Sequence, residues 1–270
     1  MNTQINFSKI RAVLLDMDGV VYVGEQPLPG VQDFMDFLEG TGRQWLCLTN
    51  NSSKTPPMFV EKLERMQVRS KPENVLDSSQ ATAKWMIAQY PNRGTVLPIG
   101  HEGLRVAMQD AGFTLTDRND EADFVVAGID FDMTYAKMEE ATLAIHKGAT
   151  FIGTNDDPTF PSEKGQVPGA GSILAMIQTT TGVEPIVIGK PNAGMFEQAL
   201  SQLGVTAEET MMVGDRYETD IIGAIELGMI TVGVLTGVTT AEQFAAYDHP
   251  PDIVLHGLPD LLDLWKRVEG

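Results

Sequence analysis

Short apolar runs alternate with helix-period segments along almost all of the 270 residues. This alternation is typical of parallel strands joined by crossover helices, so it predicts an α/β fold. We expect strands at about 12–15, 44–48, 95–99, 124–127, 150–152, 186–188, 210–213, 230–235 and 253–255. We expect helices at about 31–39, 102–111, 135–146, 171–180 and 259–268, and another beginning near residue 56.

The charge balance narrows the range of partners. The chain has 19 basic and 37 acidic residues, which gives a formal net charge of −18. Nonspecific binding to nucleic acid or to an anionic membrane surface needs clustered Lys and Arg, so we expect neither nucleic acid nor membrane as a partner. An anionic substrate would need a cation and a few well-placed donors to reverse the local field.

The single cysteine, Cys47, excludes an internal disulfide framework and fits a reducing compartment. It lies within an apolar run, so we expect a buried core thiol. No basic-then-apolar leader opens the sequence, and no apolar run reaches about 18 residues. We therefore expect a cytoplasmic protein.

Two aspartates follow the first apolar run. Asp16 and Asp18 stand just before Gly19, where the backbone can turn sharply and approach a ligand. In an open parallel sheet the ligand crevice lies outside the carboxyl ends of the strands, so this acidic pair lies where chemistry is usually done. The alternative is an Asx-type turn that serves only backbone geometry. The next residues, 20–24, predict a small hairpin flap beside the pair.

A polar cluster follows the second predicted strand. Thr49, Asn50 and Asn51 offer hydroxyl, amide and backbone N–H groups that suit the oxygens of a phosphoryl group. Consecutive strands of a βαβ unit are usually neighbours, so the cluster is expected to lie beside Asp16 and Asp18. These residues could instead cap the helix that begins near residue 56.

Two later strands also end in charged residues. Lys190 follows the strand at 186–188, and Asp215 follows the strand at 210–213 with Asp220 one turn later. Alone, a lysine near a turn is usually solvated and an aspartate at a helix start is usually a cap. We expect all these features to lie at strand ends of the same sheet, where they form a complementary set.

Carboxylates at close quarters repel one another unless a cation intervenes. Several carboxylates and a carbonyl suit Mg²⁺, which prefers oxygen ligands. The metal and Lys190 could then neutralise a phosphate dianion. The four histidines show no paired spacing, so we do not expect zinc.

The order D-x-D-G-V, T-N-N-S, G-K-P and G-D-R-x-x-T-D resembles the haloacid dehalogenase superfamily of phosphohydrolases. The resemblance covers essentially the whole chain and is closest to the capped branch of NagD and para-nitrophenyl phosphatase, subclass IIA. It implies a Rossmann-like parallel-sheet core domain with an inserted α/β cap domain. The core would comprise residues 1–80 and 183–270, and the cap residues 81–182.

The resemblance assigns the reacting groups. Asp16 would be the nucleophile that forms an aspartyl-phosphate, and Asp18 would protonate the leaving oxygen and then deprotonate water. Asp16, the Asp18 carbonyl and Asp215 would hold Mg²⁺, with Asp220 acting beside it through water or its neighbours. Dehalogenases of this fold lack the second acid, so Asp18 favours phosphate esters.

The resemblance also assigns the substrate-binding groups. Thr49, Asn50 and Asn51 would bind the phosphoryl oxygens, and Lys190 would stabilise charge during transfer. Relatives often dimerise through the cap, so a homodimer of this kind is compatible with the resemblance.

We expect a Mg²⁺-dependent phosphatase of small phosphomonoesters such as sugar phosphates, nucleoside monophosphates or aryl phosphates, including para-nitrophenyl phosphate. Two alternatives stay open at the level of the sequence. One is a noncatalytic phospholigand-binding protein that kept the fold. The other is a phosphotransferase that passes the phosphoryl group to an acceptor other than water.

Overall fold

The computed structural model of the chain describes residues 5–162 and 164–269. Its contacts divide these residues into two compact units. The first unit holds the described residues up to Thr49, then Pro57–Leu76, and those from Ala199 onward. The second holds Asn50–Pro56 and Asp77–Gln198. The division into a core of residues 1–80 and 183–270 and a cap of residues 81–182 stays a prediction.

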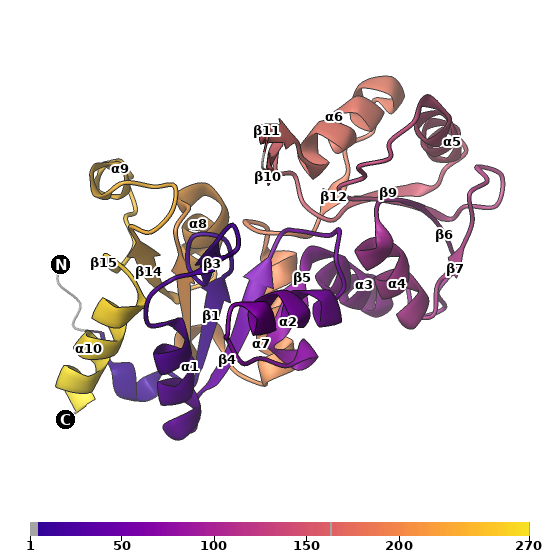
Figure 1. Ribbon diagram of the computed structural model, residues 1–270. Coiled ribbons are helices and arrows are strands. Elements are labelled where there is room, and N and C mark those ends of the chain that lie inside the picture. Colours follow the sequence, from indigo (N-terminus) through magenta and orange to yellow (C-terminus); the bar gives the residue numbers. More distant parts are fainter. Residues whose placement is uncertain (1–4, 163, 270) are drawn as a thin grey trace. The chain divides into compact units, whose positions relative to one another are not determined.

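The first unit is built on a six-stranded sheet with the strand order β15-β14-β13-β1-β4-β5 (Figure 1). Its strands are β1 (Ala12–Asp16), β4 (Gln44–Thr49), β5 (Val75–Asp77), β13 (Thr210–Gly214), β14 (Ile230–Val234) and β15 (Ile253–Leu255). The pairings of β1 with β4 and β13, and of β14 with β13 and β15, are parallel. This confirms the predicted parallel sheet.

Helices cover this sheet because both of its faces are apolar. Their bounds are α1 (Val31–Gly40), α2 (Pro56–Arg65), α8 (Ile222–Glu226), α9 (Ala241–Ala246) and α10 (Leu258–Glu269), with α7 (Ala193–Leu203) shared by both units. Val13 and Leu15 of β1 join a core with apolar residues of α1, α2 and α10. Ala12 and Leu14 alternate with them and are equally buried. Burial on both faces is typical of parallel strands with crossover helices.

The register of β1 decides where the site lies. Asp16 lies opposite Leu48 of β4, and Leu15 lies opposite Val213 of β13. The carboxyl ends of the three strands therefore lie together, as the βαβ pattern predicts for Asp16 and Thr49. Cys47, in β4, is fully buried as expected.

A short hairpin follows β1. Strand β2 (Tyr22–Val23) pairs antiparallel with β3 (Gln26–Pro27), and Gly24 lies in the turn with a φ of 61°. The hairpin confirms the predicted flap.

The second unit contains a five-stranded sheet with the order β12-β9-β8-β6-β7. Its strands are β6 (Thr95–Ile99), β7 (Thr114–Leu115), β8 (Phe124–Ala127), β9 (Thr150–Gly153) and β12 (Ile186–Val187), and all their pairings are parallel. Its helices are α3 (Ser78–Gln89), α4 (Glu102–Asp110), α5 (Tyr135–His146) and α6 (Ala170–Thr181). Apolar side chains of α5 and α6 pack with those of β6, β8 and β9.

The placement of β12 corrects one expectation. The strand before Lys190 pairs with β9 in this second sheet, and does not join the sheet that carries Asp16 and Asp215. The prediction that all four motifs follow strands of one sheet is therefore wrong for Lys190. The observed pairing follows the order of the chain, because β12 comes after β9 and α6, and consecutive strands of a βαβ unit are usually neighbours.

The residues between the predicted strand at 150–152 and the predicted helix at 171–180 contain a second hairpin. Strand β10 (Thr159–Ser162) pairs antiparallel with β11 (Gly165–Pro168). Most of its side chains are exposed, so its sequence lacks the alternation of a strand buried on one face. None of the described helices combines the length and the apolar composition needed to cross a membrane.

Asp77 caps the first helix of the second unit. Its Oδ1 accepts hydrogen bonds from the backbone N–H groups of Ser79 at 2.8 Å and Gln80 at 3.0 Å. The side chain is 1% exposed, and its other oxygen, Oδ2, is buried without a hydrogen-bond partner. Burial raises the pKa of Asp77 to about 7, although the two N–H donors and the charge of Lys84 act in the opposite direction.

This shift predicts a pH-dependent contribution to stability. A carboxyl whose pKa is higher in the folded state favours folding most below its unfolded pKa, and the contribution is lost as the pH rises through about 7. Asp77→Asn keeps the capping oxygen but cannot ionise. We expect it to be as stable as the wild type near pH 4 and more stable at pH 8, by up to about 4 kcal/mol in free energy of unfolding. Urea unfolding of both proteins at the two pH values checks this, and a difference that does not change with pH would contradict it.

Candidate active site

Three carboxylates converge at the carboxyl ends of β1 and β13. Asp16 ends β1, Asp215 follows β13, and Asp220 lies in a π-helical turn, η4 (Tyr217–Ile221). Each offers an oxygen atom, and these three oxygens lie within 4.8 Å of one another. Asp215 and Asp220 are 4% and 1% exposed, and Asp16 is partly buried.

Two glycines allow this close approach. Gly19, with a φ of 91°, lies so near Asp215 that a Cβ there would be 2.5 Å from the carboxyl carbon. A Cβ on Gly237 would be only 1.9 Å from Asp215 Oδ2. Real Cβ contacts are essentially never below 3.0 Å, so any larger residue at either position would displace the carboxylate. The turn geometry that Gly19 predicted is therefore coupled to the position of Asp215.

Backbone groups fix the orientation of the two later carboxylates. Asp215 Oδ2 accepts a hydrogen bond from the N–H of Val238 at 2.7 Å. Asp220 Oδ2 accepts one from the N–H of Arg216 at 3.2 Å, and its Oδ1 accepts one from the Thr219 hydroxyl, also at 3.2 Å. These hydrogen bonds, two from backbone N–H groups and one from a hydroxyl, hold the two carboxylates in place.

The donor set fits a hard divalent cation. Three carboxylates this close repel one another, and a bound cation removes the repulsion. All the groups offer oxygen, which is the ligand atom that Mg²⁺ prefers. The residues present therefore fit Mg²⁺.

Asp18 differs from these three carboxylates in its exposure to solvent. Its side chain is exposed, and its Oδ2 accepts a hydrogen bond from the Tyr22 hydroxyl at 3.3 Å. Tyr22 itself is 1% exposed. Burial, and then the charges of Asp18 and Asp16, raise the pKa of Tyr22 above its ordinary value. The phenol therefore stays protonated and remains a hydrogen-bond donor at neutral pH.

The second unit holds Lys190 and Asn50 together. Lys190 is 2% exposed. Its backbone N–H donates to Asn50 Oδ1 at 2.9 Å, and Asn50 Nδ2 donates to its carbonyl oxygen at 2.9 Å. The Asn50 side-chain amide thus forms two hydrogen bonds with the Lys190 backbone, although the residues are 140 positions apart.

Asn51 forms a local turn. Its Oδ1 accepts hydrogen bonds from the Ser53 N–H at 3.0 Å and from the Ser53 hydroxyl at 2.7 Å. This is an Asx turn that precedes α2, and the capping of α2 weighed for the polar cluster stays a prediction. Thr49 is buried at the end of β4.

The predicted site residues are therefore divided between the two units. Asp16, Asp18, Thr49, Asp215 and Asp220 lie in the first, and Asn50, Asn51 and Lys190 lie in the second. Asp16, Asp215 and Asp220 are brought together in one, and Asn50 and Lys190 in the other. The chemical roles assigned to all eight residues stay predictions.

Two further residues around Asn50 were not predicted as site residues. Asn155 Nδ2 donates to the Asn50 carbonyl oxygen at 2.7 Å, and Asn50 Nδ2 donates to Asp157 Oδ2 at 3.1 Å. Both come from the Asn- and Asp-rich stretch that follows β9. Nothing in their spacing indicates which of these polar residues points toward Asn50.

A second group of ligand atoms was also not evident from the sequence. His101, Asp130 and Asp132 each offer an atom within 4.8 Å of the others. Asp130 already pairs with Lys137 Nζ at 2.7 Å, and Asp132 is largely exposed. Because the Lys137 ammonium competes for Asp130, this group is a poorer metal site than the one formed by Asp16, Asp215 and Asp220.

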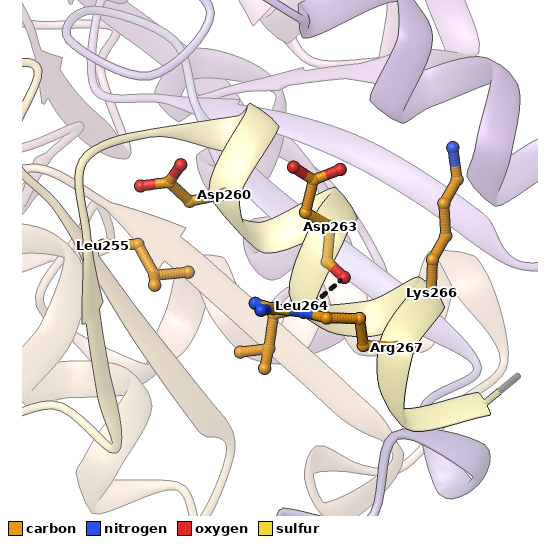
Figure 2. Close-up of a pocket in the computed structure, with 6 residues that line it drawn as sticks. All are labelled: Leu255, Asp260, Asp263, Leu264, Lys266 and Arg267. Atoms are coloured by element: carbon orange, nitrogen blue, oxygen red, sulfur yellow. Dashed lines mark hydrogen bonds between the residues drawn. The ribbon is translucent and has the colours of Figure 1, made fainter.

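A surface pocket runs along α10 (Figure 2). Its lining residues are Leu255, Asp260, Asp263, Leu264, Lys266 and Arg267. The Arg267 Nε donates to the Asp263 carbonyl oxygen at 3.2 Å, a bond within one turn of helix. The lining contains none of the predicted site residues, so this pocket adds nothing to the candidate active site.

Residues 13–114 match the family described as haloacid dehalogenase-like hydrolase, and residues 187–261 match the one described as HAD-hydrolase-like. An acid sugar phosphatase from Staphylococcus epidermidis is 42% identical over 242 residues, which cover 89% of this chain and 92% of that protein.

Solved structures show the same similarity. The 4-nitrophenylphosphatase from Thermotoga maritima is 34% identical and superposes with a TM-score of 0.89, covering 95% of this chain and 98% of that one. NagD from E. coli K-12 is 27% identical with a TM-score of 0.87, covering 92% and 97%. The chain therefore belongs to the haloacid dehalogenase-like hydrolases and is a NagD-like phosphatase.

Proposed function

We propose that this phosphatase hydrolyses small-molecule phosphomonoesters, such as sugar phosphates, nucleoside monophosphates and aryl phosphates, in a Mg²⁺-dependent reaction through an aspartyl-phosphate intermediate. The observation that carries the proposal is the convergence of Asp16, Asp215 and Asp220 within 4.8 Å at the ends of neighbouring strands. The names of relatives that act on sugar phosphates and on 4-nitrophenyl phosphate support the substrate class.

In the proposed first step, a carboxylate oxygen of Asp16 attacks phosphorus, and the bond from phosphorus to the ester oxygen breaks. The leaving oxygen takes a proton from Asp18. In the second step Asp18 accepts a proton from water, the water oxygen attacks phosphorus, and the Asp16 carboxylate is released with inorganic phosphate. Asp18 returns to its protonated form, so the cycle is balanced.

The cation would be held by the carboxylates of Asp16 and Asp215 and by the Asp18 carbonyl, with Asp220 acting beside it. When bound, Mg²⁺ supplies positive charge that stabilises the phosphoryl oxygens during transfer. The fixed orientation of the Asp215 carboxylate, through its bond to Val238, preorganises this ligand.

The family resemblance also implies roles for the remaining residues. We assign Lys190 to charge stabilisation and Thr49, Asn50 and Asn51 to the phosphoryl oxygens. The two-point hydrogen bonding of Asn50 to Lys190 gives Asn50 an additional positioning role. A homodimer through residues 81–182 and a cytoplasmic location stay predictions.

Asp18→Asn tests the general acid. We expect kcat/KM for sugar phosphates to fall about 100- to 10,000-fold, because an alkoxide leaves poorly without a proton. The loss in kcat/KM for para-nitrophenyl phosphate should be smaller, since a nitrophenolate needs little protonation. Measuring kcat/KM for both substrates checks this, and equal losses would count against Asp18 as the acid.

The function itself is tested by incubating the protein with a panel of phosphomonoesters, in Mg²⁺ and in chelator, and measuring free phosphate. We expect phosphate release that requires Mg²⁺ and ranks the substrates. Release that persists in chelator would overturn the Mg²⁺ dependence. Consumption of ester without free phosphate, in the presence of an alcohol acceptor, would indicate transfer to an acceptor other than water.

A further inference from the structure

The loop after β1 closes on itself around Tyr22. The N–H groups of Val21 and Tyr22 donate to the Met17 carbonyl oxygen at 2.9 and 3.1 Å. The N–H of Gly19 donates to the Tyr22 carbonyl oxygen at 2.8 Å. These bonds fix the backbone on both sides of Asp18, and the buried Tyr22 ring belongs to the core of the first unit.

The Tyr22 ring is held from its other side by a cation. Lys62 Nζ, from α2, lies 3.6 Å from the ring centroid, and the same nitrogen lies 3.8 Å from a carboxylate oxygen of Glu25 in the flap turn. A cation over an aromatic face attracts the ring electrons and holds the ring in place. The phenol is therefore positioned by the core, by the flap and by α2 together.

The Tyr22 phenol is buried, whereas the carboxyl that it contacts, that of Asp18, is exposed. The Asp18 side chain is exposed, and the Tyr22 hydroxyl donates to its Oδ2 at 3.3 Å. An exposed carboxyl can rotate away from a reacting group, and a donor on one oxygen limits that rotation. The same donor serves both protonation states, because a protonated carboxyl retains an acceptor oxygen.

We propose that Tyr22 is a positioning residue that orients the Asp18 carboxyl for proton transfer through the hydrogen bond to Oδ2. This inference rests on the proposed role of Asp18 as general acid and base. Tyr22 does not touch the substrate in this proposal. It acts only through Asp18. In the first step its removal should affect those substrates that depend on protonation of the leaving group, and in the second step, which all substrates share, it should affect every substrate alike.

The test is Tyr22→Phe, which removes the hydroxyl and keeps the ring under Lys62. We expect kcat/KM for the best sugar phosphate of the panel to fall roughly 10- to 100-fold, the effect of losing one hydrogen bond to a charged group. For para-nitrophenyl phosphate, kcat/KM should change by less than about 3-fold, because its leaving group needs little protonation. We compare kcat/KM because it reports the first step, whereas kcat also contains the second step, in which Asp18 acts as base for both substrates.

Tyr247→Phe is the matched control, since it removes a phenol hydroxyl that donates to the Glu218 carboxylate. It should leave both substrates unaffected. If thermal unfolding shows that Tyr22→Phe does not fold, Lys62→Met decides the question. Removing the Lys62 ammonium frees the Tyr22 ring. A loss of kcat/KM confined to sugar phosphates then supports the proposal, and no loss overturns it.

An unchanged ratio of the two kcat/KM values in folded Tyr22→Phe would overturn the role of Tyr22 and leave the phosphatase mechanism standing. A wild-type protein that releases no phosphate from any ester would instead overturn the proposed function. The two failures are therefore distinguishable.

Discussion

Asp16→Asn is expected to abolish phosphatase turnover, with kcat at least ~1,000-fold below the wild type for every substrate of the panel. An amide oxygen is a poor nucleophile and cannot form the aspartyl-phosphate. The fold should persist because Asn has the same shape and because the backbone of β1 keeps its pairing with β4 and β13. Removing one of three adjacent charges should, if anything, stabilise the metal-free protein.

The measurement is phosphate release from para-nitrophenyl phosphate and a sugar phosphate in Mg²⁺, with thermal unfolding to confirm the fold. Asp36→Asn is the matched control. It makes the same change on the exposed face of α1, where the carboxylate pairs with Arg69 at 2.7 Å. Exposed pairs of this kind contribute little, so its turnover should match the wild type. Wild-type turnover from folded Asp16→Asn would exclude this nucleophile.

The sequence predicted most of the parallel strands because their residues are buried on both faces. In β1 and β8 every position except Asp16 is buried, so an unbroken apolar run marks the strand. Helix α1 was equally clear, since Val31, Phe34, Met35 and Leu38 recur at helical spacing. Helix α3 was not expected, because its buried face consists mainly of Ser, Thr and Ala.

The pairing of the strands was harder to predict from the sequence than the positions of the strands. The adjacency of Asp16 and Thr49 followed from the rule that consecutive βαβ strands are neighbours. The same rule pairs the strand before Lys190 with the preceding parallel strand across α6, and β12 does pair with β9. The expectation of one sheet failed because the rule was not applied to this strand.

The residue types of the site were predictable, but their supports were not. Carboxylates after strand ends mark Asp16 and Asp215 in the sequence itself. The contacts that hold them come from distant residues: Val238 donates to Asp215, and Gly237 leaves room for it. Such contacts join loops from different strands, and no local pattern encodes them.

The second large effect is expected for Asp215→Asn. Its amide oxygen can still accept the hydrogen bond from Val238, and its amide nitrogen would donate toward neighbouring carboxylates in place of a repelling charge. The variant should therefore unfold in chelator at the same temperature as the wild type or higher. In Mg²⁺ it should lose the stabilisation that the cation gives, because a neutral amide is a weaker ligand for a hard cation. Turnover should fall at least ~100-fold.

Thermal unfolding across a Mg²⁺ titration, with and without chelator, separates these two effects from a general loss of stability. Asp263→Asn is the control, since Asp263 is an exposed carboxylate in the pocket along α10. Its Mg²⁺ response should equal that of the wild type if the cation binds at Asp16, Asp215 and Asp220. A full Mg²⁺-dependent rise in the unfolding temperature of Asp215→Asn would place the cation elsewhere. Loss of that rise together with unchanged stability in chelator assigns Asp215 to the metal, because a variant that merely loosened the fold would unfold earlier in both conditions.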